Sequence, residues 1–169
     1  MSKFLYWIPV ILLLISCSKE DNPINGEEDH TATGFLRGNV ENASWFADKI
    51  QAYKQSSIIY ITGTQKINNS SAYTSSILNF KIINISQTGT FGIGEDEPGF
   101  KYFVKASYTL KSAGAAPDKK YTAYYRDYSV FDMSRIDDKG LDATFIFVTY
   151  SQDFLDSVNF TSGVIKIDY

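Results

Sequence analysis

Apolar and polar residues alternate along much of the chain after residue 34, which is the pattern of strands rather than helices. The alternation is clearest in 100–111, where lysine, serine and threonine lie on one face and the other face carries Phe100, Tyr102, Val104, Ala106, Tyr108 and Leu110. A second run, 76–85, places Leu78, Phe80 and Ile82 on one face. Each run predicts an antiparallel strand with one buried face.

The segment 141–150 has a different pattern, because it is apolar on both faces from Phe145 to Val148. This predicts a central strand that is covered on both sides. The preceding residues, Asp137 to Gly140, are typical of a type I turn with Gly140 in the left-handed position. We therefore expect a hairpin here.

Further strands are expected where short apolar runs are separated by polar and glycine-rich turn residues. One short helix, capped by Ser151, could form over 151–157. Roughly 8–10 short strands predict an all-β domain, either an antiparallel sandwich or a strongly curved two-layer sheet or barrel. Alternation does not distinguish these architectures. The additional strands are expected over 34–41, 45–54, 57–64, 88–93, 120–126, 128–136 and 157–168.

The N-terminus has the layout of a secretory signal. Lys3 precedes residues 4–15, which carry no charge, and small residues follow. As a helix, such a run would rise about 18 Å, which is short for a bilayer core of about 30 Å. We therefore expect a signal peptide over 1–16 rather than a permanent membrane span.

Residues Leu14-Ile15-Ser16-Cys17 resemble the lipobox of bacterial lipoproteins. The resemblance implies cleavage before Cys17 and a lipid on its thiol, so the membrane would be a partner through this anchor. The alternative is an ordinary signal peptide beside a stray cysteine. Cys17 is the only cysteine, which excludes a disulfide within the chain.

The residues after Cys17 bear on location. Ser18 stands where an aspartate would resemble an inner-membrane retention signal, so the outer membrane is expected. Lys19, Glu20 and Asp21 resemble the surface-export tag of Bacteroidota lipoproteins. The alternative is a charged linker on a lipoprotein that faces the periplasm.

The chain then divides into a tether and one domain. Residues 17–33 are polar and acidic and contain Pro23 and Gly26, which predicts a disordered tether. Residues 34–169 suit a single domain. The net charge of the whole chain is −3 and there is no basic stripe, so nucleic acid is not expected as a partner.

Three short motifs carry a family resemblance. They are the opening segment 35–47 with Trp45-Phe46-Ala47, the segment Thr88-Gly89-Thr90-Phe91, and the terminal segment 158–167 with a glycine between apolar residues. Together they resemble small Bacteroidota outer-membrane or surface lipoproteins whose C-terminal β domain has no known function. The resemblance implies an all-β fold and no particular activity.

The domain lacks the residue types for several kinds of chemistry. Cys17 and His30, the only cysteine and histidine, both precede residue 34, so neither a cysteine or serine nucleophile paired with histidine nor a zinc site is expected. The acidic loop 94–99 lacks the ligand spacing of an EF-hand and reads as an exposed turn, with calcium as the alternative. We expect no cofactor, no metal and no catalytic residue, although a pair of carboxylates for glycan hydrolysis stays a remote alternative.

Aromatic residues are the remaining signal. Tyr124 and Tyr128, beside Arg126, are candidates for contact with a glycan or protein partner. The alternative is cross-strand packing in the core, where Trp45 is also expected. The sequence thus favours a non-enzymatic surface binding or accessory module of the cell envelope. The alternative is a structural or envelope-assembly component without a small ligand.

Overall fold

The computed structural model describes residues 30–95, 103–124 and 128–169, and in these ranges the chain forms strands and no helix. The prediction of an all-β domain is confirmed. The described residues form eleven strands in one sheet, which is one strand more than the upper end of the expected number. They are β1 (Thr33–Val40), β2 (Ala43–Phe46), β3 (Lys49–Gln55), β4 (Ile58–Lys66), β5 (Tyr73–Ile83), β6 (Gly89–Gly92), β7 (Val104–Ser112), β8 (Lys119–Ala123), β9 (Val130–Ile136), β10 (Gly140–Ser151) and β11 (Ser157–Asp168).

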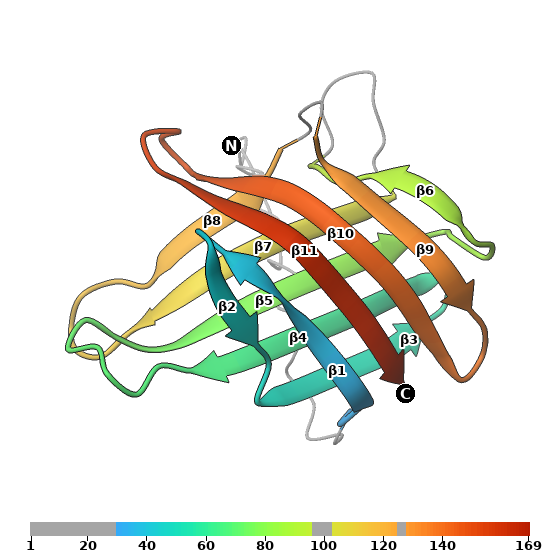
Figure 1. The fold of residues 1–169 in the computed structure, drawn as a ribbon, viewed down its shortest axis with the longest axis horizontal. Coiled ribbons are helices and arrows are strands. Elements are labelled where there is room, and N and C mark those ends of the chain that lie inside the picture. Colours follow the sequence, from blue (N-terminus) through green and yellow to red (C-terminus); the bar gives the residue numbers. More distant parts are fainter. Residues whose placement is uncertain (1–29, 96–102, 125–127) are drawn as a thin grey trace, which may run out of the picture.

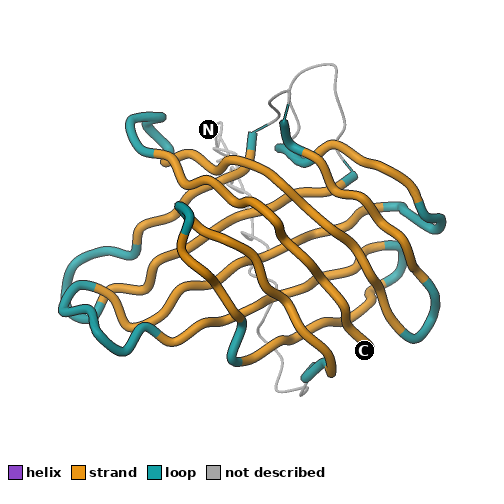
Figure 2. Tube along the Cα trace, in the orientation of Figure 1, coloured by secondary structure: helices purple, strands orange, loops and turns teal. Residues whose placement is uncertain are grey.

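The sheet is antiparallel and curls into a half-barrel with two crossing layers (Figures 1 and 2). Its main order is β2–β1–β11–β10–β8–β7–β5–β4–β3, and β6 and β9 extend the β10 side. The sheet turns at β10, because the first part of this strand pairs with β9 while Thr149–Ser151 pair with β8. The predicted curved two-layer sheet is therefore the observed architecture.

The two layers also meet near the start of β1. The Ala32 amide donates to the Ile50 carbonyl at 3.1 Å, and the Ala52 amide donates to the His30 carbonyl at 2.9 Å. The His30 ring stacks on Tyr53. Residues 30–32, which the sequence places in the tether, therefore lie along β3 and help to hold the half-barrel together.

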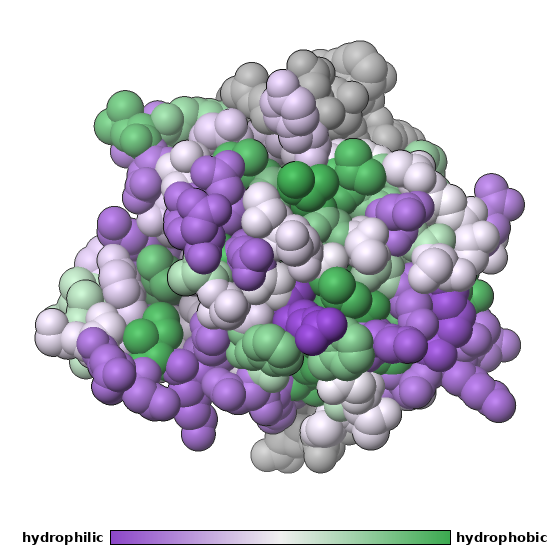
Figure 3. Space-filling view, viewed as in Figure 1, coloured by the Kyte–Doolittle hydropathy of each residue, from purple (hydrophilic) through white to green (hydrophobic). Residues whose placement is uncertain are grey.

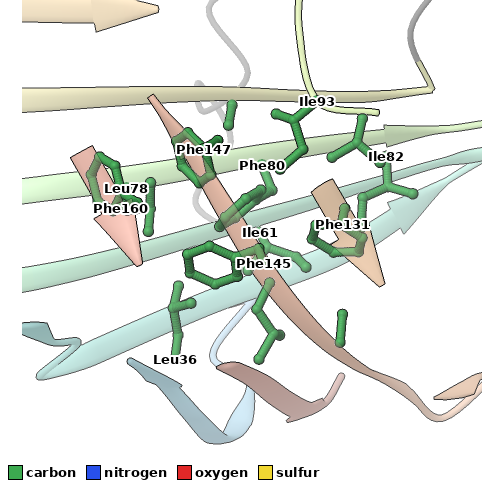
Figure 4. Close-up of a cluster of buried hydrophobic side chains, with 14 of the residues drawn as sticks. Leu36, Ile61, Leu78, Phe80, Ile82, Ile93, Phe131, Phe145, Phe147 and Phe160 are labelled. Atoms are coloured by element: carbon green, nitrogen blue, oxygen red, sulfur yellow. The ribbon is translucent and has the colours of Figure 1, made fainter. Parts of the chain in front are cut away.

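Aromatic rings fill the centre of the half-barrel (Figure 4). The Phe80 ring lies 4.9 Å from Phe145 and 5.8 Å from Phe147, centroid to centroid, and Phe147 stacks on Phe160 at 4.7 Å. Trp45 is buried as predicted, and its indole Nε1 donates to the buried Ser76 hydroxyl at 2.8 Å. These contacts follow from the alternation, which directs large apolar side chains to one face.

The prediction that β10 is covered on both faces is wrong. Phe145 and Phe147 point into the core, whereas Ile146 is 40% exposed and Val148 is half-buried. A half-barrel encloses one core, so β10 can bury only one of its two faces. The strand is nevertheless central in the sheet, because it pairs with β8, β9 and β11.

Two glycines allow close packing rather than unusual backbone angles. A Cβ on Gly163 would lie 2.1 Å from the Phe145 ring, so this glycine makes room for a core phenylalanine. Gly140 does not have the predicted left-handed conformation. Instead, the Asp137 carboxylate accepts the Lys139 and Gly140 amides, and a Cβ on Gly140 would overlap the Ile167 carbonyl.

Two other local predictions differ from the structure. The expected strand over 45–54 is divided between β2 and β3, because the chain turns at Ala47 and Asp48 to pass between the layers. Residues 151–157 form no helix. They complete β10, form a turn and begin β11, since the Ser151 amide bonds to the Asp156 carbonyl across a hairpin.

Candidate binding surface at the β10–β11 hairpin

The turn between β10 and β11 is held by a dense set of hydrogen bonds. The Ser151 hydroxyl donates to the Asp153 carboxylate at 2.6 Å and accepts the Asp156 amide at 3.0 Å. The same Asp153 oxygen accepts the Leu155 amide at 3.2 Å. Because the Ser151 hydroxyl donates to it and the Leu155 amide also bonds to it, the pKa of Asp153 is lowered. The turn is therefore ordered by its own polar residues.

This ordered turn displays apolar side chains. Phe154 is 52% exposed and Leu155 is 87% exposed, and the tip of the hairpin is apolar on the molecular surface (Figure 3). Phe154 has a φ of 59°, in the left-handed region that non-glycine residues seldom occupy. An exposed phenylalanine in this conformation is unusual for a turn that has only a connecting role.

Phe154 belongs to a group of three aromatic residues, with Tyr124 and Tyr150, which we call the hairpin cluster. The Tyr124 ring lies 4.8 Å from Phe154 and 6.4 Å from Tyr150, and Phe154 lies 6.0 Å from Tyr150. The interplanar angles of these pairs are 46°, 59° and 39°. Tilted rings do not cover each other completely, so part of the ring surface remains available for contact.

Leu155 contributes to a groove beside β8. The groove has a volume of ≈ 470 Å³. Its wall includes Tyr121, whose hydroxyl donates to Asp156 at 2.8 Å. Burial and this hydrogen bond to a carboxylate raise the pKa of Tyr121, which stays a neutral donor. Lys119 lies 3.7 Å from the same carboxylate, so these two charges of the wall form an ion pair.

The two predicted tyrosines differ in exposure. Tyr124 is half-buried in the hairpin cluster, where it packs on Tyr150 and Phe154, whereas Tyr128 is 74% exposed. The other predicted residues, Arg126 and the anchor and export residues Cys17, Lys19, Glu20 and Asp21, lie outside the described residues.

Sequence reasoning missed Tyr150 and Phe154. Tyr150 could have been found from the alternation of its strand, because it follows the buried Thr149 and so lies on the outer face. The signal for Phe154 was an aromatic residue between Asp153 and Asp156 in a polar turn. The sequence allows a short helix over 151–157, and in a helix a single phenylalanine does not indicate a binding surface.

The acidic loop at 94–99 can be followed only at its beginning. The Glu95 carboxylate accepts the Lys105 ammonium group at 3.1 Å, which gives this acid a structural partner. Residues 96–99 lie outside the described ranges. Within those ranges, no group of three or more histidine, cysteine, aspartate or glutamate side chains is placed to hold a metal ion.

A second charged cluster, around Arg135, has a structural role. The Arg135 guanidinium bonds to the Asp168 carboxylate and donates to the Ile167 carbonyl at 3.0 Å. Asp142 lies 3.4 Å from the same guanidinium. These contacts join β9, β10 and β11, and the hydrogen bond to Asp168 raises the pKa of Arg135. The cluster therefore joins adjacent strands and pairs the Arg135 charge with carboxylates.

The fold and this surface define an antiparallel half-barrel that carries an ordered aromatic hairpin. Residues 32–167 match a family described as Domain of unknown function (DUF6252), and the chain belongs to this family. No curated protein and no solved structure matches the chain. Among the described residues, no helix is long and apolar enough to cross a membrane.

Proposed function

We propose that this protein is a cell-envelope lipoprotein whose β domain is a non-enzymatic binding module. The hairpin cluster, Tyr124, Tyr150 and Phe154, is its contact surface. The observation that carries this proposal is the ordered turn that holds Phe154 exposed at positive φ beside two tyrosines.

The conformation of the turn supports a binding role on energetic grounds. A left-handed backbone costs an L-residue roughly 1–2 kcal/mol, and a glycine at position 154 would avoid that cost. Aromatic residues supply large contact areas with few rotatable bonds and are enriched at binding hot spots. Because the turn is already ordered by Ser151 and Asp153, little conformational entropy is lost when a ligand is bound.

The sheet edges favour binding over the alternative of structural assembly. The end strands β2 and β6 each have four residues, and the longer end strand β3 is partly covered by residues 30–32. Short or covered edges are poor templates for edge-to-edge association. The exposure of the carboxylates favours a binding function over catalysis of glycan hydrolysis. In the described part of the chain, no aspartate or glutamate is fully buried, whereas a general acid usually needs burial to raise its pKa.

The anchor remains part of the proposal. Lipid on Cys17 would hold the chain at the outer membrane, and Lys19, Glu20 and Asp21 would direct it to the cell surface. From Cys17 to His30 the chain can span at most roughly 45 Å when extended. That reach is enough for the hairpin to meet ligands away from the bilayer. The alternative is a lipoprotein that faces the periplasm.

The binding role is tested with the full chain purified in detergent and immobilised. Polysaccharide and protein fractions from the native envelope and its surroundings are passed over wild type and over Tyr124→Ala/Phe154→Ala. We expect saturable binding that the double variant loses. Phe46→Ala is the matched control, since Phe46 is 49% exposed on β2, away from the hairpin. Equal binding by all three proteins would refute the proposed surface.

The anchor is tested separately in the native host. Cys17→Ser should block lipidation and leave unprocessed precursor. Changing Lys19, Glu20 and Asp21 to alanine should leave the protein lipidated but protected from protease added to intact cells, whereas wild type is digested. Equal protection of both proteins would show that the lipoprotein faces the periplasm, and equal digestion would place the export signal elsewhere.

A further inference from the structure

A row of uncharged polar side chains crosses the convex outer face of the layer formed by β3, β4, β5, β7 and β8. Each member is paired in register with the next across adjacent strands, and each is half-buried on the face opposite the core. We call these residues the uncharged row, and they are Gln51, Thr62, Asn79, Ser107 and Thr122.

The row leads directly to the hairpin cluster. Thr122 pairs in register with Tyr150, so the row and the cluster share one continuous surface where the sheet turns from β8 to β10. Adjacent strands lie about 4.8 Å apart, and the five steps from Gln51 to Tyr150 therefore cover about 24 Å. This length suits an extended ligand rather than a small molecule.

Hydrogen bonds within the row orient its side chains. The Thr62 hydroxyl donates to the Asn79 carbonyl oxygen at 2.9 Å, and the Asn79 amide nitrogen donates to the Ser107 hydroxyl at 3.5 Å. Each of these groups retains further donor or acceptor capacity for a ligand. A shallow groove of ≈ 190 Å³ lies over this part of the row.

Two of the lysines beside the row have partners. The Lys105 ammonium bonds to Glu95, and the Lys81 ammonium lies over the Tyr60 ring, 5.5 Å from its centroid. On the other side of the row the register places Lys49, Thr64, Ile77, Thr109 and Lys120 in turn, so the middle of this side carries no charge and an exposed lysine lies at each end. The middle of the row, at Thr62, Asn79 and Ser107, therefore offers uncharged hydrogen-bonding groups, which match an uncharged ligand.

Sugar hydroxyls fit this chemistry, because each hydroxyl both donates and accepts, as do the amide and hydroxyl groups of the row. Aromatic rings at the end of the row can pack against the apolar face of a sugar ring. An extended peptide fits less well, since it would need unpaired backbone groups at a sheet edge, whereas the row crosses paired strands.

We propose that the uncharged row binds an extended neutral polysaccharide that runs across the strands from the hairpin cluster. This inference rests on the proposed binding function and specifies the chemical class of its ligand. The ligand would lie perpendicular to the strands, with its hydroxyls bonded to Thr62, Asn79 and Ser107 and a terminal ring against Tyr150.

The experiment is calorimetric titration of the full chain in detergent with neutral gluco-, manno- and xylo-oligosaccharides of increasing length. Oligosaccharides of uronic acids are the charged comparison. We expect saturable binding of a neutral series, with affinity that rises with length until the row is spanned. Thr62→Val and Ser107→Ala preserve shape and should each weaken binding about tenfold, as expected for loss of a ligand hydrogen bond.

The control is Thr144→Val, because Thr144 is an exposed threonine on the outer face of β10 and outside the row. It should bind as wild type does, and circular dichroism melts should show that all three variants are folded. No saturable binding of any neutral series, affinity independent of length, tighter binding of uronic acid chains, or equal losses in Thr144→Val would each overturn the inference.

The inference and the proposed function fail in different ways. If the oligosaccharides do not bind but the double variant of Tyr124 and Phe154 still abolishes capture of a native fraction, only the polysaccharide assignment is wrong. If neither measurement shows binding, the hairpin cluster is not a contact surface and both proposals fail.

Discussion

Two groups of aromatic side chains lie on the outside of the half-barrel, and they are built in opposite ways. His30, Tyr53 and Tyr60, which we call the ladder, stack at 4.4 Å and 4.8 Å with interplanar angles of 24° and 17°. The hairpin cluster has tilted rings, with Phe154 on an exposed turn. In the ladder the rings cover each other, whereas in the cluster ring surface remains exposed.

The difference follows from where each group stands in the fold. Tyr53 and Tyr60 are directly opposed on β3 and β4, so their rings align with the pleat, and His30 extends the stack where the layers meet. Phe154 has no strand partner and is positioned by the turn. The ladder therefore stabilises the closure of the sheet, whereas the hairpin cluster presents a surface. The predictions below separate these two roles.

Among the aromatic substitutions, those of buried rings should cause the largest loss of stability. Phe145 is buried against Phe80 and Phe147, so Phe145→Ala should lower the free energy of unfolding by about 3–5 kcal/mol. Urea denaturation measures this change. A loss below about 1 kcal/mol would mean that the rings at the centre do not hold the two layers together.

Gly163→Ala should have the next largest effect. A Cβ at this position overlaps the Phe145 ring, and overpacking of this kind costs roughly 1–3 kcal/mol. Combining it with Phe145→Leu should cost less than the sum of the two single changes, because the smaller side chain leaves room for the methyl group. Strict additivity in urea denaturation would argue against this contact.

The ladder should respond through stability alone. Tyr53→Ala removes ring contacts with His30 and with Tyr60, and we expect a loss of about 0.5–1.5 kcal/mol. Thermal melts measure this loss. Capture of native fractions should be unchanged once the variant is folded, and a loss of capture as large as that of Tyr124→Ala/Phe154→Ala would remove the distinction between the two groups.

Phe154→Gly should show the reverse behaviour. Relief of the left-handed backbone and loss of the contact with Tyr124 are each about 1 kcal/mol and of opposite sign, so stability should change by less than about 0.5 kcal/mol. Binding should nevertheless be lost with the ring. A clear destabilisation in the thermal melt would assign Phe154 to packing instead of contact.

The smallest expected effect is a loss of order in the β10–β11 turn at low pH. The pKa of Asp153 is lowered by its bonds from Ser151 and Leu155, so these bonds stabilise the turn fully above the ordinary value of about 3.9 and are lost as pH falls through the lower folded value. The amide proton shift of Leu155 in an NMR titration should have its midpoint below about 3.9. A midpoint at or above that value would show that Asp153 does not order the turn.

Alternation predicted the face of most core residues correctly, including Leu78, Phe80, Val104 and Tyr108, since the side-chain period of a strand is fixed by covalent geometry. It could not predict that Ile146 is exposed. An apolar residue on the outer face of a strand has the same local pattern as one beneath a second layer, and only the closure of the sheet distinguishes them.

The candidate site was predictable only in part for a related reason. Tyr124 was found because it lies in an aromatic segment, but its neighbours Tyr150 and Phe154 come from a different strand and from a turn. Their proximity depends on the pairing of Thr149–Ser151 with β8, a contact between distant segments that periodicity does not encode. The stack of His30 on Tyr53 was missed for the same reason.

The central claim is that the hairpin cluster, unlike other exposed aromatic positions, touches a ligand. Site-specific photo-cross-linking in the native host tests it most directly, with p-benzoylphenylalanine in place of Phe154 and, in a second strain, in place of Phe46. We predict a cross-linked species that depends on light and forms only from position 154. Cross-links of equal yield from both positions, or from position 46 alone, would contradict the account.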